Sequence, residues 1–398
     1  MSGWTTFFVV LVALVAAGWI FRFAGQKLTG NAPKFRDMPF AVAFGYALGV
    51  AVLAWVIWTW VQARFVMDEQ TANKYFFFVM AVQGLVLSAI AAWIFRLFGQ
   101  SVGTGGTRKL FRQMPLTASF GILIILIYAI LAIFAGLIAP HGQETVFPQA
   151  NVVPGGNPAL GGNPDFPLGT DQIGRDILSR LIYGAQNTVG IAFVTTLLAF
   201  FLGGSLGFLA ATLRGWVDQV LSRTVDVLMA IPSLIFALLL ITVASAWVQG
   251  AGLTVAMIII MALIDSTRVF RLARAVGMNI VVMDYIEAAK LRGEKLGYIV
   301  FREILPNATA PLLAEFGLRF CFVFLTISSL SFLGVGIQPP LADWGTMVKD
   351  LSAFINYAAF APQISAAPLM AAGAIALLTV AVNFVVDWML HRSSGLKE

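Results

Sequence analysis

The sequence predicts an all-α, polytopic membrane protein. Hydrophobic residues make up 59% of its 398 residues and charged residues only 11%, and the mean hydropathy is +0.88. Soluble domains contain about a quarter charged residues, whereas a helix that crosses a bilayer needs about 20 mostly apolar residues. Apolar blocks of that length recur along the whole chain between short polar segments. The chain is therefore expected to form a set of membrane-spanning helices.

About nine such blocks are present, and we expect each to form one spanning helix. Each block is bounded by charged residues or by clusters of Gly and Pro. The approximate apolar cores are residues 5–21, 40–62, 75–95, 116–138, 188–212, 225–247, 251–267, 308–336 and 368–390.

The first spans contain an internal repeat. Residues 19–22, Trp-Ile-Phe-Arg, recur at 93–96, and the basic loop Phe-Arg-x-Met-Pro at 35–39 recurs at 111–115. The offset of about 75 residues covers a complete unit of span, loop and span in one orientation. The first span lacks the basic n-region of a secretory signal, so we expect it to stay in the membrane. Two roles remain open for the repeated unit: a packing or assembly appendage, and a regulatory element.

The basic residues are concentrated on one side of the predicted membrane. Lys and Arg in residues 22–36, 96–112, 214–223 and 268–303 and in the C-terminal tail outnumber those in the opposite loops by about four to one. The positive-inside rule places these segments in the cytoplasm, with the N-terminus outside and the C-terminus inside. Because the net charge of +6 follows this topology, it does not indicate nucleic-acid binding.

Residues suited to metal, redox or hydrolytic chemistry are scarce. Cys321 is the only cysteine and lies in an apolar block, while His141 and His391 are far apart in the sequence. The glycine-rich segment 103–109 lacks the spacing of an ATP-binding P-loop. We therefore expect no catalytic residue, no metal site and no bound cofactor in this chain.

The longest outer loop, residues 139–187, is rich in turn-forming residues and ends in a polar motif at 168–180. We expect Thr170 or Asp171 to cap a short amphipathic helix that lies on the membrane surface. Its apolar side would hold Ile173, Ile177, Leu178 and Leu181, and its water-facing side Arg175, Asp176 and Arg180. The helix is either a platform for a partner or substrate, or a solvated connector.

A charged, helix-forming segment at residues 284–307 separates two apolar blocks on the cytoplasmic side. Gly293 allows an elbow between two helical pieces, and Pro306 fits the opening turn of the next span, where its missing N–H costs nothing. The residues expected to pack inward are Ile286, Leu291, Leu296 and Ile299, and those left for another protein are Glu287, Arg292, Lys295 and Arg302. The alternative is a basic loop that serves orientation alone, which rarely needs Gly and Pro at structured positions.

Two pairs of ionisable residues fall in or near apolar blocks. Asp265 and Arg268 are three residues apart and Glu315 and Arg319 four apart, so each pair can neutralise itself on one helix face. Both pairs are expected near the cytoplasmic ends of their spans. Structural pairing is the favoured interpretation, and a functional site inside the membrane is the alternative.

Residues 284–307 carry a recognisable signature. The run Glu287-Ala288-Ala289 is followed after three residues by Gly293 and after nine more by Glu-Ile-Leu-Pro-Asn at 303–307. This pattern resembles the EAA motif of the membrane subunits of ATP-binding-cassette (ABC) importers. Several other segments are similar to the C-type permease subunits of the dipeptide/oligopeptide group, namely 168–180, 225–233, 331–336 and 339–345.

The resemblance covers about residues 110–398, roughly three quarters of the chain. It implies a six-helix type I ABC importer core at 113–398, with the coupling loop at about 284–307. It does not explain the three-helix transmembrane extension at 1–112, which departs from the short cytoplasmic tail usual in the family.

The resemblance also implies roles for both motifs, because the elbow of such subunits docks into a groove on the ATPase. The ATPase-coupling residues would be Glu287, Ala288, Ala289, Arg292, Gly293 and Pro306. The external family motif would comprise Gly169, Thr170, Asp171, Gly174, Arg175 and Asp176.

The implied assembly lies in the bacterial inner membrane. It contains a second, B-type permease, two cytoplasmic ATPase subunits that hold ATP and Mg²⁺, and an extracytoplasmic substrate-binding protein. The solutes would be dipeptides, oligopeptides or similar small molecules, with nickel, glutathione and oligosaccharides also open. The alternative is a stand-alone carrier driven by an ion gradient through Asp265 and Glu315, which has no use for the cytoplasmic elbow.

Overall fold

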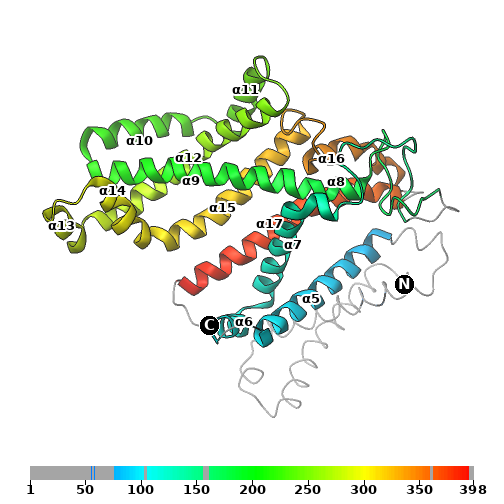
Figure 1. Cartoon of the computed structure of the whole chain (residues 1–398), viewed down its shortest axis with the longest axis horizontal. Coiled ribbons are helices and arrows are strands. Elements are labelled where there is room, and N and C mark those ends of the chain that lie inside the picture. The colour runs from blue at the N-terminus through cyan, green and yellow to red at the C-terminus, as the bar shows by residue number, and fades with distance from the viewer. Residues whose placement is uncertain are drawn as a thin grey trace, which may run out of the picture. The chain divides into compact units, whose positions relative to one another are not determined.

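The computed structural model describes residues 76–102, 105–155, 161–358 and 362–393, together with Trp55 and Trp58. Over these residues the fold consists of helices and loops with two isolated β-bridges, so the all-α class is confirmed (Figure 1). The elements are α5 (Phe76–Val102), α6 (Gly105–Gln113), α7 (Leu116–Ile138), α8 (Ile177–Gly184), η2 (Ala185–Val189), α9 (Gly190–Leu213), α10 (Gly215–Met229), α11 (Ser233–Ser245), α12 (Ala251–Val281), α13 (Asp284–Leu291), α14 (Leu296–Tyr298), η3 (Ile299–Ile304), α15 (Leu305–Phe332), α16 (Trp344–Leu351), η4 (Ser352–Tyr357) and α17 (Pro362–Ser393).

Six helical stretches among the described residues are long and apolar enough to cross a membrane, and the bent pair α10 and α11 makes a seventh if it counts as one span. The helix α7 fills the expected block 116–138, and α5 and α17 cover the blocks near 75–95 and 368–390. The expected span 5–21 lies outside the described residues, and within 40–62 only Trp55 and Trp58 are described. The total of nine spans therefore stays a prediction.

Three spans are longer than their apolar cores. One runs through α8, η2 and α9 (Ile177–Leu213), one is α12, and one runs through α14, η3 and α15 (Leu296–Phe332). Each of the 37-residue stretches is roughly 55 Å long at the α-helical rise, against about 30 Å for the hydrocarbon core. Hydropathy identifies only the apolar part of a helix. The polar ends by which these three helices extend beyond their apolar cores were therefore not predicted.

The span expected at 225–247 is not one continuous helix. The structure breaks it into α10 and α11, which meet at an angle of 88°. Pro232 lies at the break with an extended ψ of 121°. A proline has no N–H to donate and disfavours the helical conformation of the residue before it, which accounts for the interruption.

The helices α9 and α12 pack closely through small residues. The glycines Gly203 and Gly207 of α9 lie against the backbone of α12, and a Cβ at Gly207 would come within 2.6 Å of the Phe270 carbonyl oxygen. Small residues spaced four apart allow two membrane helices to approach this closely. This contact fixes α12, which leads into the charged segment that follows it.

The corner between α5 and α6 is formed by residues of the sequence repeat. The Arg96 side chain donates to the carbonyl oxygens of Phe111 (3.1 Å) and Arg112 (2.9 Å). The rings of Phe95 and Phe111 meet edge to face at 5.4 Å. The repeated residues of this copy thus close the turn between two helices, which favours a packing role for the repeat.

Candidate functional site

The elbow expected at 284–307 is present. After α12 ends at Val281, the chain turns and α13 begins at Asp284. In Figure 1, α13 and α14 form the tip at one end of the helices, and α8 and α16 lie at the other end. The two motifs singled out in the sequence therefore lie at opposite ends of the spans.

Gly293 ends α13 in a well-defined cap. Its φ is +79°, its N–H donates to the Lys290 carbonyl (2.9 Å), and the Glu294 N–H donates to the Ala289 carbonyl (3.2 Å). This is the Schellman arrangement of a helix C-terminus, in which a left-handed residue satisfies the last carbonyls. No atom lies within 4 Å of a Cβ built on Gly293, so conformation and not space requires a glycine.

Burial divides the EAA residues into two groups. Ala289 and Ile286 are fully buried, and Ile286 packs in an apolar cluster with residues of α12, η3 and α15. Glu287 and Ala288 are exposed. The inward packing predicted for Ile286, Leu296 and Ile299 is confirmed, but that predicted for Leu291 is wrong, because this side chain is 83% exposed.

The exposed side of the elbow contains several large apolar side chains. They are Val282, Met283, Tyr285, Leu291, Tyr298 and Phe301. Exposed charges accompany them, among them Arg292, whose ion pairs with Glu294 and Glu303 are long at 3.8 and 3.9 Å. Several large apolar side chains exposed on one short segment, among polar residues, are typical of a protein interaction site.

Pro306 lies in the first turn of α15, as predicted. The helix does not start there, however, because α14 and η3 lead into α15 without a break. The segment immediately before Pro306 is the π-helical η3. Since proline cannot donate to the carbonyl four residues earlier, a local widening of the helix accommodates it.

The helix expected to be capped by Thr170 or Asp171 begins later. It starts at Ile177, and its N-cap is Asp176, whose carboxylate accepts from the N–H groups of Leu178 (3.2 Å) and Ser179 (3.1 Å). The prediction that Asp176 and Arg180 face water is wrong, because both are buried. The helix is the first part of a membrane span and not a separate surface helix.

Residues 169–176 form a compact turn in place of the expected helix. The Asp171 carboxylate accepts from the Arg175 Nε (2.6 Å) and from the Arg175 and Ile173 N–H groups. The φ of Gly174 is +87°, and a Cβ there would collide with the Phe147 carbonyl. Thr170 holds the preceding loop by donating to the Gln149 carbonyl (2.8 Å). The six residues of the external motif thus build a loop whose polar groups bond to one another and to neighbouring segments.

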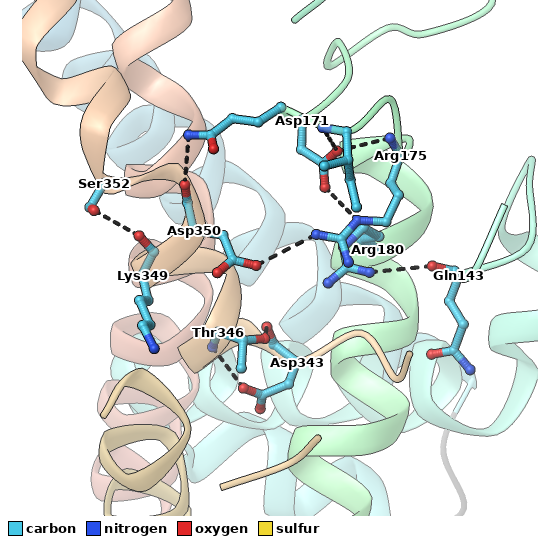
Figure 2. A network of polar contacts seen from close by, with 11 residues as sticks. Gln143, Asp171, Arg175, Arg180, Asp343, Thr346, Lys349, Asp350 and Ser352 are labelled. Atoms are coloured by element: carbon cyan, nitrogen blue, oxygen red, sulfur yellow. Dashed lines mark hydrogen bonds and ion pairs between the residues drawn. The ribbon is translucent and has the colours of Figure 1, made fainter. Parts of the chain in front are cut away.

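Figure 2 shows this loop joined to the last turn of α16. Arg175 reaches Asp350 at 3.5 Å, and the buried Arg180 donates to the Gln143 carbonyl at 3.3 Å. Sequence reasoning did not place these segments together. The only signal was the similarity of 339–345 to the same family.

Asp343 is the central buried acid of this region. Its carboxylate caps α16 by accepting from the Thr346 N–H (2.8 Å) and also accepts from the Thr188 hydroxyl (2.8 Å). Burial raises the pKa of the Asp343 carboxyl, and hydrogen bonds from Thr346, Thr188 and Ser331 oppose the rise. These bonds tie α16 to η2 and so to the span that follows the external motif.

The pairing predicted for the intramembrane charges is confirmed. Arg268 Nη1 lies 3.9 Å from Asp265, and Arg319 Nε lies 2.5 Å from Glu315. Their expected position near the cytoplasmic ends of the spans stays a prediction, because α12 continues to Val281 and the helical stretch of α15 starts at Leu296, both beyond the apolar cores. Within the helices themselves, both pairs lie several turns from either end.

Comparison with known proteins agrees with these features. Residues 203–394 match the family of the binding-protein-dependent transport system inner membrane component. The dipeptide transport system permease protein of Alkalihalophilus pseudofirmus is 31% identical over 63% of this chain and 79% of its own length. The glutathione transport system permease protein of Pectobacterium atrosepticum is 30% identical over 70% and 86%, and the peptide transport system permease protein of Escherichia coli is 35% identical over 61% and 79%.

These relatives are permease subunits and support the importer interpretation, not the carrier driven by an ion gradient. The match to each of the first two relatives covers most of that relative's length, which is far more than a shared motif. With the elbow in place at one end of its membrane-spanning helices, the chain belongs to the family of binding-protein-dependent inner-membrane transport components and is a multi-pass permease subunit of an ABC importer, similar to the C-type subunits of the dipeptide/oligopeptide group.

Proposed function

We propose that this chain forms, with a second B-type permease, the translocation pathway for dipeptides, oligopeptides or similar small solutes. Two ATPase subunits dock on its cytoplasmic side and on that of its partner, and an extracytoplasmic binding protein delivers the solute. The N-terminus lies outside and the C-terminus in the cytoplasm, as the distribution of basic loops favours.

The elbow is the observation that supports this proposal best. Buried Ile286 and Ala289 fix α13 to the spans, while Glu287, Ala288 and Leu291 point away from the chain. A structured, partly apolar surface of this kind is costly unless a partner covers it. Docking of an ATPase gives it that partner and connects ATP hydrolysis to movement of α12 and α15.

The chain contributes no catalytic group in this proposal. ATP and Mg²⁺ belong to the partner ATPase subunits, because the sequence has no P-loop spacing. The permease therefore acts mechanically, by changing the opening of the pathway when the elbow moves.

The relatives favour short peptides as the solutes. Their names refer to dipeptides, peptides and glutathione, which share amide bonds and free carboxylates. Nickel complexes and oligosaccharides are not represented among these three relatives.

Substitution of Gly293 tests the coupling role. Gly293→Val forces a β-branched residue into a left-handed conformation, which costs about 1–2 kcal/mol or more and distorts the elbow. In the reconstituted complete transporter, we expect about a tenfold loss of peptide uptake and of binding-protein-stimulated ATP hydrolysis. The matched control is Gly297→Ala, on a helical glycine of the same loop with open space around it, which should leave both unchanged.

Two results would contradict the proposal. One is full uptake and full ATP hydrolysis by the Gly293→Val complex, provided that it assembles in normal yield. The other is peptide uptake by the wild-type chain alone in vesicles without ATP or ATPase subunits.

A further inference from the structure

One face of α15 is polar along much of its length. Glu315, Arg319, Phe322, Thr326 and Ser329 follow one another at intervals of four, three, four and three residues, so they line a single helix face. We refer to these five residues as the α15 stripe. All five are at least partly exposed among the described residues, and Phe322 is 51% exposed.

The α15 stripe is unsuited to contact with lipid tails. Ionisable groups inside a span face a protein interior or a water-filled cavity, because a charge in hydrocarbon is unfavourable. The stripe combines a carboxylate, a guanidinium and two hydroxyls with one aromatic ring. It therefore faces a polar space enclosed when the permease is assembled.

A mostly apolar groove adjoins the α15 stripe at its Ser329 end. Its volume is about 370 Å³, and it lies between α15, α16 and α17. Leu325, Phe332 and Val348 line it, and Ser328 and Ser329 are its polar residues. A solute that entered from the outer side would pass from this groove onto the α15 stripe.

Phe322 lies between two guanidinium groups. The Cζ of Arg319 is 4.8 Å from the ring centroid and the Cζ of Arg268, on the neighbouring α12, is 5.7 Å from it. Such distances are typical of cation–π contacts. Two helices thus bring two cations to one exposed aromatic ring.

The two arginines differ in how fully they are neutralised. Arg319 is held by Glu315 at 2.5 Å and is largely buried, although its Nη1 is buried without a hydrogen-bond partner among the described residues. Arg268 is 37% exposed, and its ion pair with Asp265, the only one it makes to a described residue, is 3.9 Å long. Arg268 therefore retains hydrogen-bond donors that an anionic group can use.

We propose that Arg268 and Phe322 form a transient binding site for the C-terminal carboxylate and adjoining peptide plane of a peptide in transit. This inference rests on the proposed function. The Arg268 guanidinium donates to the carboxylate, and the ring of Phe322 packs against the peptide plane. Asp265 limits the strength of binding by competing for Arg268, so the peptide is released again.

The test compares two forms of one peptide, with a free C-terminal carboxylate and with a C-terminal amide. Both are offered to the complete transporter with its own binding protein in proteoliposomes. Arg268→Gln should lower uptake of the free acid about tenfold, the effect of one charge-assisted hydrogen bond, and leave uptake of the amide unchanged. Arg268→Lys, which retains the charge, should restore most of the preference for the free acid.

Arg271→Gln is the matched control, because Arg271 lies one turn further along α12 and pairs with Asp226 of α10 at 2.9 Å. It should leave the ratio of free acid to amide uptake as in the wild type. Since the binding protein is the same throughout, any change in the ratio arises in the permease.

An Arg268→Gln transporter with an unchanged ratio of free acid to amide uptake would overturn the inference, whether both uptake rates fall together or neither falls. If the wild-type complex takes up neither peptide, the proposed function itself fails and this inference fails with it.

Discussion

At the elbow, Glu287, Ala288 and Leu291 point away from the chain, whereas in the external motif Thr170, Asp171 and Asp176 are buried. Both segments are motifs of the same permease family, yet the first leaves side chains for a partner and the second uses its side chains within the fold. The difference shows that a sequence motif can preserve either an interface or a local structure. Burial and hydrogen bonding distinguish the two cases.

The largest expected effect comes from a comparison within the elbow. Ile286→Ala removes buried atoms from the cluster between α13 and the spans and should lower the free energy of unfolding by about 2–5 kcal/mol. Leu291→Ala makes a similar change on the exposed side of the same helix and should leave stability within about 0.5 kcal/mol. Thermal unfolding of the purified permease measures both.

The Leu291→Ala variant should instead weaken assembly with the ATPase, measured by co-purification and by ATP hydrolysis. A destabilised Leu291→Ala permease that still binds the ATPase normally would show that this residue belongs to the fold and not to the interface.

A smaller loss of stability is expected in the external motif. Asp176→Ala removes the N-cap of α8 and leaves the Ser179 hydroxyl and the His141 ring without their carboxylate partner. We expect a cost of about 2–3 kcal/mol, again measured by thermal unfolding. Asp165→Ala, at an exposed aspartate of the same loop, should have no comparable effect. Wild-type stability with reduced uptake in Asp176→Ala would identify a contact with the binding protein or solute.

The smallest expected effect is the pH dependence contributed by Asp343. Burial raises the pKa of this carboxyl in the folded state, so above the ordinary aspartate pKa of about 3.9 the unfolded state loses its proton first. The stability contribution of Asp343 therefore decreases as the pH rises from there toward the folded-state pKa. Asp343→Asn cannot ionise and should flatten the pH dependence of the melting temperature over that range. Asp350→Asn, at a half-exposed carboxylate, should leave the wild-type dependence in place.

Local features of the molecule were predictable from the sequence. The elbow at Gly293 follows from a conformation that glycine adopts readily, and the pairing of Glu315 with Arg319 follows from helical spacing. The start of α8 was misplaced by six residues or so, because Asp171, Asp176 and Thr170 are all good N-cap residues. The choice among them depends on Phe147, Gln149 and His141, which lie in a preceding loop.

The sequence by itself determined the membrane class, most of the described spans and the elbow, because hydropathy, helical periodicity and glycine conformation depend on neighbouring residues. Only the tertiary structure decided which motif side chains are buried, and that Arg268 and Arg319 meet at Phe322. The physical reason is that burial and ion pairing between helices depend on distances through space. Residues far apart in the chain set those distances once the helices pack.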